Sequence, residues 1–387
     1  MYFGHLLSAT QDPRRRIIIM WNASGVVDDA ERSWRAFFPT LHIIGAPKTG
    51  SSSLHDYVAR AHICGPYSER THERHKELPM WYYGPWAAKT AAAEYALNFR
   101  GPLLGRLNQS CAAFADSTPT RLASGFSPRE LARLAAGAQL RDHIRIIVIL
   151  REPISRHLSW YNHRLAQPVD FHTPDPFSFW QSEMRQCPSF KRLPTGAVPS
   201  HAMVAACHLE KWQSSGCQTN TSRSSASVQC WQRQAQRVGT FNWVVESIYA
   251  PALSLWTAHW PRKQILVLQF GALISEGMGP ALDFAGIRLS STGASVQHAS
   301  LPLVNTKDSA CKARLVECAT QHAMSAVFDP WNEVLLAQLR DDVHAGRAPT
   351  QEPAFAPFVV QSLCESRTLP PVNLSQCVVP AARVVYR

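Results

Sequence analysis

Residues 41–54 read LHIIGAPKTGSSSL, and this stretch decides the fold. The apolar run Leu41 to Ala46 has the length and the Ile/Leu content of a buried strand. A glycine-containing turn follows, and Ser52 to His62 then places apolar side chains on one face of a helix. A strand that passes through such a turn into a helix leaves free backbone N–H groups and the positive end of the helix dipole pointing at the turn. The stretch therefore predicts an anion site built on an α/β fold.

Two further apolar runs, Ile144 to Leu150 and Ile265 to Phe270, have the same character as the first. Helix-compatible stretches lie between the runs, at Pro128 to Leu140 and at Ile154 to Arg164. Strands that alternate with helices are typical of a parallel sheet covered on both faces. The sequence therefore predicts a three-layer α/β domain with a central parallel sheet flanked by helices.

We expect one main domain at residues 39–345, preceded by an N-terminal extension at 1–38 and followed by an extended tail at 346–387. The tail contains several prolines, and we expect it to run over the surface rather than to form a new domain. Residues 167–239 are rich in Pro, Ser, Gln and Cys. We interpret them as an insertion or a substrate-side region of the main domain.

Lysine and arginine number 39 against 28 aspartates and glutamates, a net charge of +11 with only 17% charged residues. This excess favours an anionic ligand such as nucleic acid, an acidic membrane, a phosphorylated cofactor or an acidic glycan. Charge alone does not choose among these ligands. The longest basic run is Arg14 to Arg16, however, and we expect no nucleic-acid partner.

The ten cysteines are compatible with disulfides in an oxidising compartment, and reduced thiols are the alternative. Three close pairs lie in polar, loop-like sequence and are predicted to staple local loops: Cys217/Cys230, Cys311/Cys318 and Cys364/Cys377. No two cysteines are separated by two to four residues, so we expect no zinc site and no other metal. Four N-glycosylation sequons also favour the secretory pathway: Asn22, Asn108, Asn220 and Asn373.

The apolar run Ile17 to Trp21 follows Arg14 to Arg16 and is too short to cross a bilayer or to form a signal-peptide core. A lumenal enzyme needs an anchor or a signal. We therefore expect either membrane association through a missing N-terminal anchor or a cytoplasmic protein.

The order of residues in the turn separates two kinds of phosphate loop. A Walker A loop, GxxxxGK[ST], needs its lysine directly after the second glycine. Here Ser51 occupies that place and Lys48 precedes Gly50. A P-loop kinase or ATPase is therefore the weaker hypothesis, although Lys48 still supplies a positive charge and Gly50 lets the backbone approach a phosphate.

Residues Pro47 to Leu54 resemble the 5′-phosphosulfate-binding loop of sulfotransferases that use 3′-phosphoadenosine-5′-phosphosulfate (PAPS). The resemblance implies a P-loop-like, nucleotide-binding sulfotransferase fold. It also implies that Lys48 contacts the 5′-phosphate and the bridging oxygen. The remaining residues of the loop would then hold the phosphate: Thr49, Gly50, Ser51, Ser52 and Ser53.

A second nucleotide-binding element follows the strand Ile144 to Leu150. Arg151 lies at the carboxyl end of this strand, where ligands bind in open parallel sheets, and Ser159 lies on the next helix. An arginine can hold two phosphate oxygens at once. The stretch Leu150 to Tyr161 resembles the 3′-phosphate-binding motif of the same family, which implies that Arg151 and Ser159 hold the 3′-phosphate of PAPS.

The candidate catalytic base lies between the two motifs. Residues His72 to Gly84 resemble the Lys-Glu-x-His-Phe-Phe region of the heparan-type Golgi sulfotransferases, which implies that Glu77 is the base and that Lys76 supports it near the sulfate. The stretch Leu78 to Trp81 departs from the aromatic residues of that region. His72 or His75 are alternative bases, because cytosolic members use a histidine, and a solvated loop without a catalytic role is the third interpretation.

Looser matches extend the resemblance. The turn Asp116 to Pro119 resembles one that shapes the acceptor cleft in the family, but it is also a common turn sequence. Phe328 to Leu336 resembles the start of the terminal helix, with Trp331 and Leu335 expected to pack it. Lys307 and Lys312 are candidate cofactor contacts, and four aromatic residues are candidates for stacking on sugars: Trp81, Tyr82, Tyr83 and Trp86.

The sequence thus predicts a PAPS-dependent carbohydrate sulfotransferase of the Golgi lumen that acts on a glycan or proteoglycan chain and needs no metal. A cytosolic small-molecule sulfotransferase is the nearest alternative. A P-loop nucleotide kinase and a glycan-binding protein without catalytic activity are the hypotheses from other classes.

Overall fold

A computed structural model describes residues 34–60, 63–68, 73–74, 76–77, 91–100, 113–125, 127–166, 176–187, 190, 198–217, 224–235, 242–287, 316–359 and 364–365. Several expectations lie outside these residues. They are the bulk of the N-terminal extension, all four sequons, His72, His75, Lys307, Lys312 and the aromatic group between Trp81 and Trp86.

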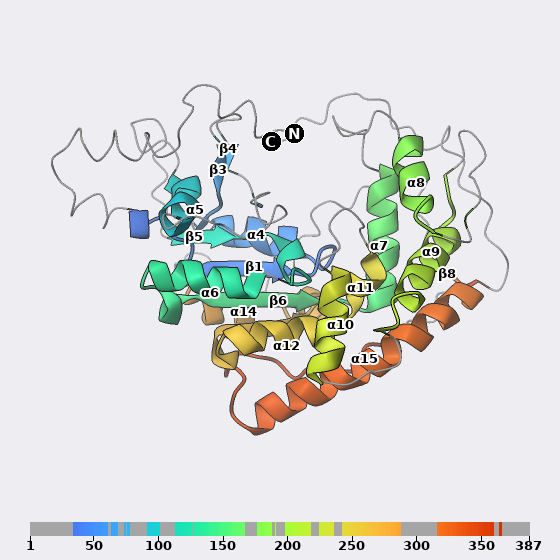
Figure 1. Ribbon diagram of the computed structural model, residues 1–387. Coiled ribbons are helices and arrows are strands. Elements are labelled where there is room, and N and C mark those ends of the chain that lie inside the picture. The colour runs from blue at the N-terminus through green and yellow to red at the C-terminus, as the bar shows by residue number, and fades with distance from the viewer. Residues whose placement is uncertain are drawn as a thin grey trace.

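The core of the fold is a five-stranded parallel sheet in the order β2-β5-β1-β6-β7 (Figure 1). Its strands are β1 (Leu41–Gly45), β2 (Ile63–Cys64), β5 (Ala113–Asp116), β6 (Arg145–Leu150) and β7 (Ile265–Gln269). The three expected strands are β1, β6 and β7, each within one residue of its expected bounds. The predicted α/β class is therefore confirmed.

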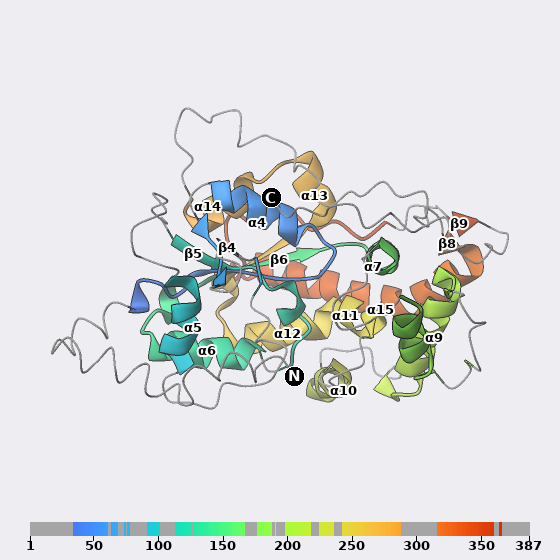
Figure 2. The same ribbon diagram turned by 90° about the horizontal axis from the view of Figure 1, so that it is seen from above.

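Helices cover both faces of the sheet, as Figure 2 shows. One face carries α4 (Ser51–Arg60), α13 (Phe270–Ser275) and α14 (Gly279–Ala285). The other face carries α5 (Ala91–Arg100), α6 (Ser127–Gly137), α12 (Tyr249–His259) and α15 (Cys318–His344). Ile147 and Ile149 pack toward the first group and Ile146 and Val148 toward the second, because neighbouring side chains of a strand point to opposite faces. An all-apolar strand is thus what a sheet buried on both sides requires.

A third apolar cluster lies at the carboxyl end of the sheet and is built on α7 (Pro153–Ala166). It includes the side chains of Trp160, Trp180 and Trp243. The region interpreted as an insertion contributes α8 (Pro176–Met184), α9 (His201–Gln213) and α10 (Ser225–Ala235), and α11 (Trp243–Ser247) follows it. The described part of residues 167–239 is therefore mainly helical, and the domain boundaries stay a prediction.

Three disulfides join described residues. Cys217–Cys230 links α9 to α10 as predicted. Cys187–Cys207 links the end of α8 to α9 and was not predicted. The predicted pairs Cys311/Cys318 and Cys364/Cys377 are wrong, because Cys318 is bonded to Cys364.

The physical reason for this error is a long-range strand pairing. β8 (Val316–Glu317) runs parallel to β9 (Cys364–Glu365), and this pairing brings the Cα atoms of Cys318 and Cys364 to 4.7 Å from each other. Proximity in sequence does not reveal such a contact. No cysteine among the described residues is free.

The segment Phe328 to Leu336 does not begin a helix, so that expectation is wrong. It lies in the middle of α15, which starts at Cys318 and continues through Pro330. The burial of Phe328, Trp331 and Leu335 in the main core offsets the hydrogen bond that a proline removes from a helix interior. The expected packing role of Trp331 and Leu335 is confirmed.

Short elements complete the described chain. They are the antiparallel pair β3 (Tyr67–Ser68) and β4 (Glu73–Arg74), and the 3-10 turns at Pro119–Arg121, Arg141–His143 and Arg262–Gln264. None of the described helices combines the length and the apolar character that a bilayer crossing requires.

Candidate functional site

The loop between β1 and α4 lies at the carboxyl edge of the sheet. Lys48 and Gly50 have φ angles of 67° and 87°, the left-handed region that glycine adopts most readily. At Gly45, an added Cβ would collide with the carbonyl oxygen of Pro119 and would lie 2.7 Å from the Cβ of Leu122. The start of the loop therefore requires a glycine at position 45.

Three serines form the first turn of α4, which begins at Ser51, one residue before its expected start. Leu54 N–H donates to the carbonyl oxygen of Gly50 at 3.0 Å and is the first main-chain bond of the helix. The N–H groups in the first turn of an α-helix point back toward the preceding loop. This end of α4 can thus receive an anion, as the sequence predicts for Ser51, Ser52 and Ser53.

Internal hydrogen bonds hold the loop in place. Ala46 N–H donates to the carbonyl oxygen of Ile149 at 2.7 Å, and the Thr49 hydroxyl donates to the carbonyl oxygen of Ala46 at 2.5 Å. The Thr49 hydroxyl proton is therefore used within the loop. Its contribution to a bound phosphate would come from its N–H group.

A buried arginine that was not predicted from the sequence holds the loop between β1 and α4 in place. Arg156 Nε donates to the carbonyl oxygen of Pro47 at 2.8 Å, and its Nη atoms contact Ser247 Oγ at 2.6 Å and Glu246 Oε2 at 3.1 Å. The guanidinium also lies 4.8 Å from the ring centroid of Trp243. Arg156 thus joins the loop between β1 and α4 to α11.

The second motif begins at the adjacent strand end. Arg151 Nη1 donates to the carbonyl oxygen of Lys48 at 3.3 Å, so the two motifs meet directly. Glu152 caps α7, because its carboxylate accepts the N–H groups of Ile154 at 2.8 Å and of Ser155 at 2.6 Å. Ser159 is half-buried two turns into this helix, and its action beside Arg151 on one phosphate stays a prediction.

The candidate base belongs to the same edge of the sheet. Lys76 Nζ donates to Glu77 Oε1 at 2.8 Å, and the two side chains are 18% and 38% exposed. Lys76 is fixed to the end of β5, because its carbonyl oxygen accepts the N–H of Ser117 at 3.1 Å. His55 Nδ1 in turn lies 2.8 Å from Ser117 Oγ. Glu77 is thus paired with a lysine whose main chain is held in place, and its own carboxylate remains accessible to solvent.

The electrostatics of Lys48 bring these elements together. The pKa of Lys48 is lowered to about 8, first by burial and then by the positive charges of Lys76, Arg164 and Arg151, with Glu77 acting in the opposite direction. Four of these five residues, all except Arg164, are also the ones that the sequence motifs predict for the site. Arg164, at the last turn of α7, was missed because an arginine near a helix end is common on protein surfaces.

The turn after β5 has a structural role. Asp116 accepts hydrogen bonds from Tyr95 at 2.6 Å, Thr118 at 2.6 Å and Arg121 at 2.9 Å, and Arg121 also contacts His42. Burial would raise the pKa of Asp116, but Arg121 and the other partners lower it overall. Asp116 and Thr118 therefore fix the base of the turn instead of facing a ligand.

Three buried histidines, His157 of α7 with His201 and His208 of α9, form a connected row of side chains. His157 Nδ1 lies 2.9 Å from His201 Nε2, and His157 Nε2 lies 3.1 Å from His208 Nδ1. His208 continues to Glu183 at 3.2 Å, and Lys211 contacts the same carboxylate at 3.0 Å. Within the described residues, no cluster of three or more His, Cys, Asp or Glu side chains is arranged to hold a metal ion. The row of histidines is a packing element between α7, α8 and α9.

A cavity of about 890 Å³ opens at the opposite edge of the sheet, where the strands begin. Its lining includes Thr40 before β1, Ala113 of β5, Arg145 of β6 and Gln264 before β7. Both sequence motifs and Glu77 lie at the other edge. The cavity is thus separate from the candidate site.

Comparisons with known proteins add little to this geometry. No protein-family model matches the chain. No curated protein matches it either. Among solved structures, the chain is similar to a sulfotransferase from Alicyclobacillus acidocaldarius, with a TM-score of 0.42 and 16% sequence identity over 80% of this chain and 98% of that chain.

Proposed function

We propose that this protein is a sulfotransferase that moves a sulfuryl group from PAPS to a hydroxyl or an amine of a carbohydrate. One observation carries the proposal. Lys48, Arg151 and the pair Lys76–Glu77 come from three distant parts of the chain and gather at one edge of a parallel sheet. This edge is where open α/β sheets bind their ligands.

The two cationic centres suit the two phosphate-bearing ends of PAPS. The loop at Lys48 offers the N–H groups of a helix start and a lysine, which suit the 5′-phosphosulfate. Arg151, with Ser159 on the following helix, suits the 3′-phosphate, because an arginine fork holds two oxygens of one phosphate. The residues present therefore fit the nucleotide that the sequence resemblance implies.

The chemistry would divide among the chain's own residues as follows. PAPS supplies a sulfuryl group already attached to a phosphate leaving group. Lys48 would stabilise the negative charge that develops on that phosphate. Glu77 would accept the proton of the acceptor hydroxyl or amine, with Lys76 orienting its carboxylate through the 2.8 Å contact.

The disulfides between described residues support an oxidising compartment for the protein, since such bonds rarely persist in the cytosol. A Golgi lumenal enzyme with a glycan or proteoglycan acceptor is our proposal on this basis. The position of Lys48 before Gly50 argues against a nucleotide kinase, whose lysine follows the glycine.

Transfer of labelled sulfate from PAPS to a panel of glycans and phenols tests the proposal. Wild-type protein should label a glycan, and Lys48→Ala and Glu77→Gln should each abolish the labelling. Glu77→Gln should still bind 3′-phosphoadenosine 5′-phosphate, whereas Lys48→Ala should not. Lys263→Ala, an exposed lysine at the far edge of the sheet, is the matched control and should behave as wild type.

Binding of the nucleotide without transfer to any acceptor would favour a glycan-binding protein that lacks catalysis. Transfer to phenols alone would favour the small-molecule class. Absence of nucleotide binding would reject the proposal.

A further inference from the structure

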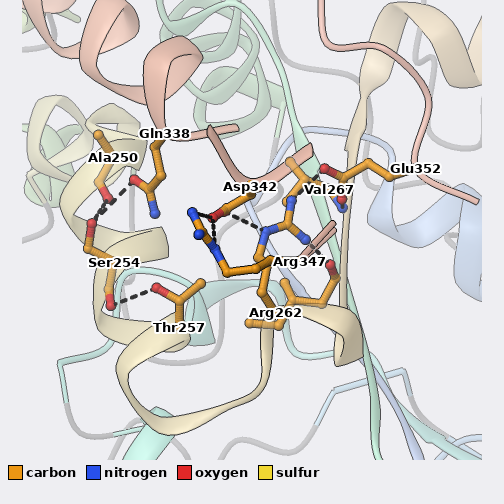
Figure 3. Close-up of polar contacts among 10 residues, drawn as sticks. Ala250, Ser254, Thr257, Arg262, Val267, Gln338, Asp342, Arg347 and Glu352 are labelled. Carbon is orange, nitrogen blue, oxygen red and sulfur yellow. Dashed lines mark hydrogen bonds and ion pairs between the residues drawn. The ribbon is translucent and has the colours of Figure 1, made fainter. Parts of the chain in front are cut away.

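The chain after α15 forms a strap, residues 349–359, that lies along β7, the last strand of the described sheet. The carboxylate of Glu352 accepts the N–H of Val267 at 2.8 Å (Figure 3). The side chain of Gln269 makes two bonds to Ala356, one to its carbonyl oxygen at 2.7 Å and one from its N–H at 3.1 Å. The strap thus follows β7 toward the carboxyl edge and covers a strand edge that would otherwise stay open.

Buried charges anchor the strap at its first turn. Glu352 pairs with the guanidinium of Arg262, and Arg262 Nε also donates to Asp342 Oδ2 of α15 at 2.9 Å, as Figure 3 shows. The side chains of Glu352 and Arg262 are only 3% and 4% exposed. An ion pair buried to this degree is costly to break, so the start of the strap is held firmly.

The other end of the strap reaches the candidate nucleotide site. Phe358 contacts the strap residue Phe355 at a centroid distance of 5.3 Å and the ring of Tyr249 at 6.1 Å. The hydroxyl of Tyr249 donates to the carbonyl oxygen of Arg151 at 2.9 Å. Burial raises the pKa of Tyr249 to about 12, so this donor keeps its proton at every physiological pH.

A second contact leads from the strap to the same arginine. Gln269, which holds Ala356, is followed directly by Phe270. The guanidinium of Arg151 lies 5.0 Å from the ring centroid of Phe270. Tyr249 therefore holds the main chain of Arg151 and Phe270 supports its side chain. The strap contacts Tyr249 directly through Phe358 and is bonded to Gln269, the residue next to Phe270.

We infer that the strap acts through Tyr249 and Phe270 to position Arg151, so that Tyr249 and Phe358 are positioning residues for recognition of the 3′-phosphate. The inference rests on the proposed function. Its consequence falls mainly on the contribution of the 3′-phosphate to binding. Arg151 makes one long bond to the loop at Lys48, which would hold the 5′ side, and that loop is also fixed by shorter bonds to Ile149 and Arg156.

The test compares the affinities of the full chain for 3′-phosphoadenosine 5′-phosphate and for adenosine 5′-monophosphate, which lacks the 3′-phosphate. In Tyr249→Phe and Phe358→Ala, affinity for the first ligand should fall about tenfold and affinity for the second should change by less than about twofold, as expected for weakening one charge-assisted contact. Phe358→Leu keeps a large apolar side chain and should therefore retain most of the wild-type preference for 3′-phosphoadenosine 5′-phosphate. Val359→Ala, a strap residue that is 74% exposed, is the matched control and should keep the wild-type preference.

The possible outcomes are distinct. If the variants lose affinity for both ligands equally, or keep the wild-type ratio, the positioning role is wrong and the proposed function stands. If the wild-type protein itself does not prefer the ligand with the 3′-phosphate, the proposed function fails and the inference fails with it. Unfolding temperatures measured beside the affinities show whether a variant is folded. Tyr249→Phe is chosen because it removes only a single oxygen atom from the folded protein.

Discussion

The guanidinium of Arg151 donates a hydrogen bond to the carbonyl oxygen of Lys48 across a sequence separation of 103 residues. This bond joins the ends of two neighbouring parallel strands, β1 and β6, each of which passes into a helix. The two cationic side chains are therefore held at one edge by the sheet itself.

Replacing Arg151 by lysine should weaken nucleotide binding although the charge is kept. A lysine cannot hold the Lys48 carbonyl and two phosphate oxygens at once, because it lacks the planar fork of arginine. Hydrogen bonds to charged groups contribute roughly 1.5–3 kcal/mol each, so the affinity for 3′-phosphoadenosine 5′-phosphate should fall about tenfold to a hundredfold. Calorimetric titration measures the loss. Arg145→Lys, at the other end of β6, is the control, and an equal loss there would contradict the assignment.

Nucleotide binding should weaken above pH 8 because of Lys48. Its pKa is lowered to about 8 in the free protein, first by burial and then by the neighbouring positive charges. A bound phosphate favours the charged form, so binding takes up a proton once the lysine is neutral. The contribution of Lys48 to the affinity should therefore be constant below about pH 7, and it should fall by up to about tenfold per pH unit above pH 8.

Titrations between pH 6 and pH 10 would detect this decline. Lys48→Arg should bind without the decline, because arginine stays charged over the whole range. If the affinity of Lys48→Arg still declined above pH 8, a group other than Lys48 would be responsible for the decline.

The buried histidines should make the fold sensitive to acid. Burial lowers the pKa of His201 and of His42 to about 3, and burial also lowers the pKa of His157 and His208. These groups are neutral when folded, whereas an unfolded histidine has a pKa of about 6.5. Their contribution to stability is complete above that pH and is lost progressively as the pH falls from about 6.5 toward the folded values.

Unfolding temperatures measured from pH 7.5 to pH 4 should therefore fall steadily below about pH 6.5. His201→Gln should show a shallower decline than the wild type. His143→Gln, at an exposed position, should keep the wild-type decline. The same slope in all three proteins would show that the row of histidines is not responsible.

The anchor of the strap should be a large contributor to stability. Arg262→Met leaves the carboxylates of Glu352 and Asp342 buried without their shared partner, and breaking a buried pair costs about 3–5 kcal/mol. Arg347→Ala removes another partner of Asp342, but Arg347 is 54% exposed and the loss should stay below about 1 kcal/mol. Urea unfolding measures both. Similar losses in the two variants would contradict this view of the anchor.

Sequence patterns predicted the elements that are determined locally. The strands β1, β6 and β7 were found because a strand buried on both faces is apolar throughout. The strands β2 and β5 were missed, since they have only two and four residues and β5 ends in Asp116, which is polar yet buried. The strand, turn and helix around Lys48 were predicted because they are contiguous in the sequence, and the binding of a phosphate there stays a prediction.

The features that sequence could not reveal depend on long-range packing. Arg156 and Tyr249 resemble ordinary helix residues until α11 and the strap are placed against them. The pairing of Cys318 with Cys364 depends on the contact between β8 and β9, and the nearer cysteines suggested the wrong partner. Spacing along the chain is thus a guide to loops and a poor guide to contacts between separate elements.

The most direct test of the central claim is a crystal structure with 3′-phosphoadenosine 5′-phosphate bound. The account predicts the 5′-phosphate in the loop of residues 46–53 beside Lys48, and the 3′-phosphate on the guanidinium of Arg151. A nucleotide bound in the cavity at the opposite edge of the sheet, or one whose phosphates contact neither Lys48 nor Arg151, would contradict it.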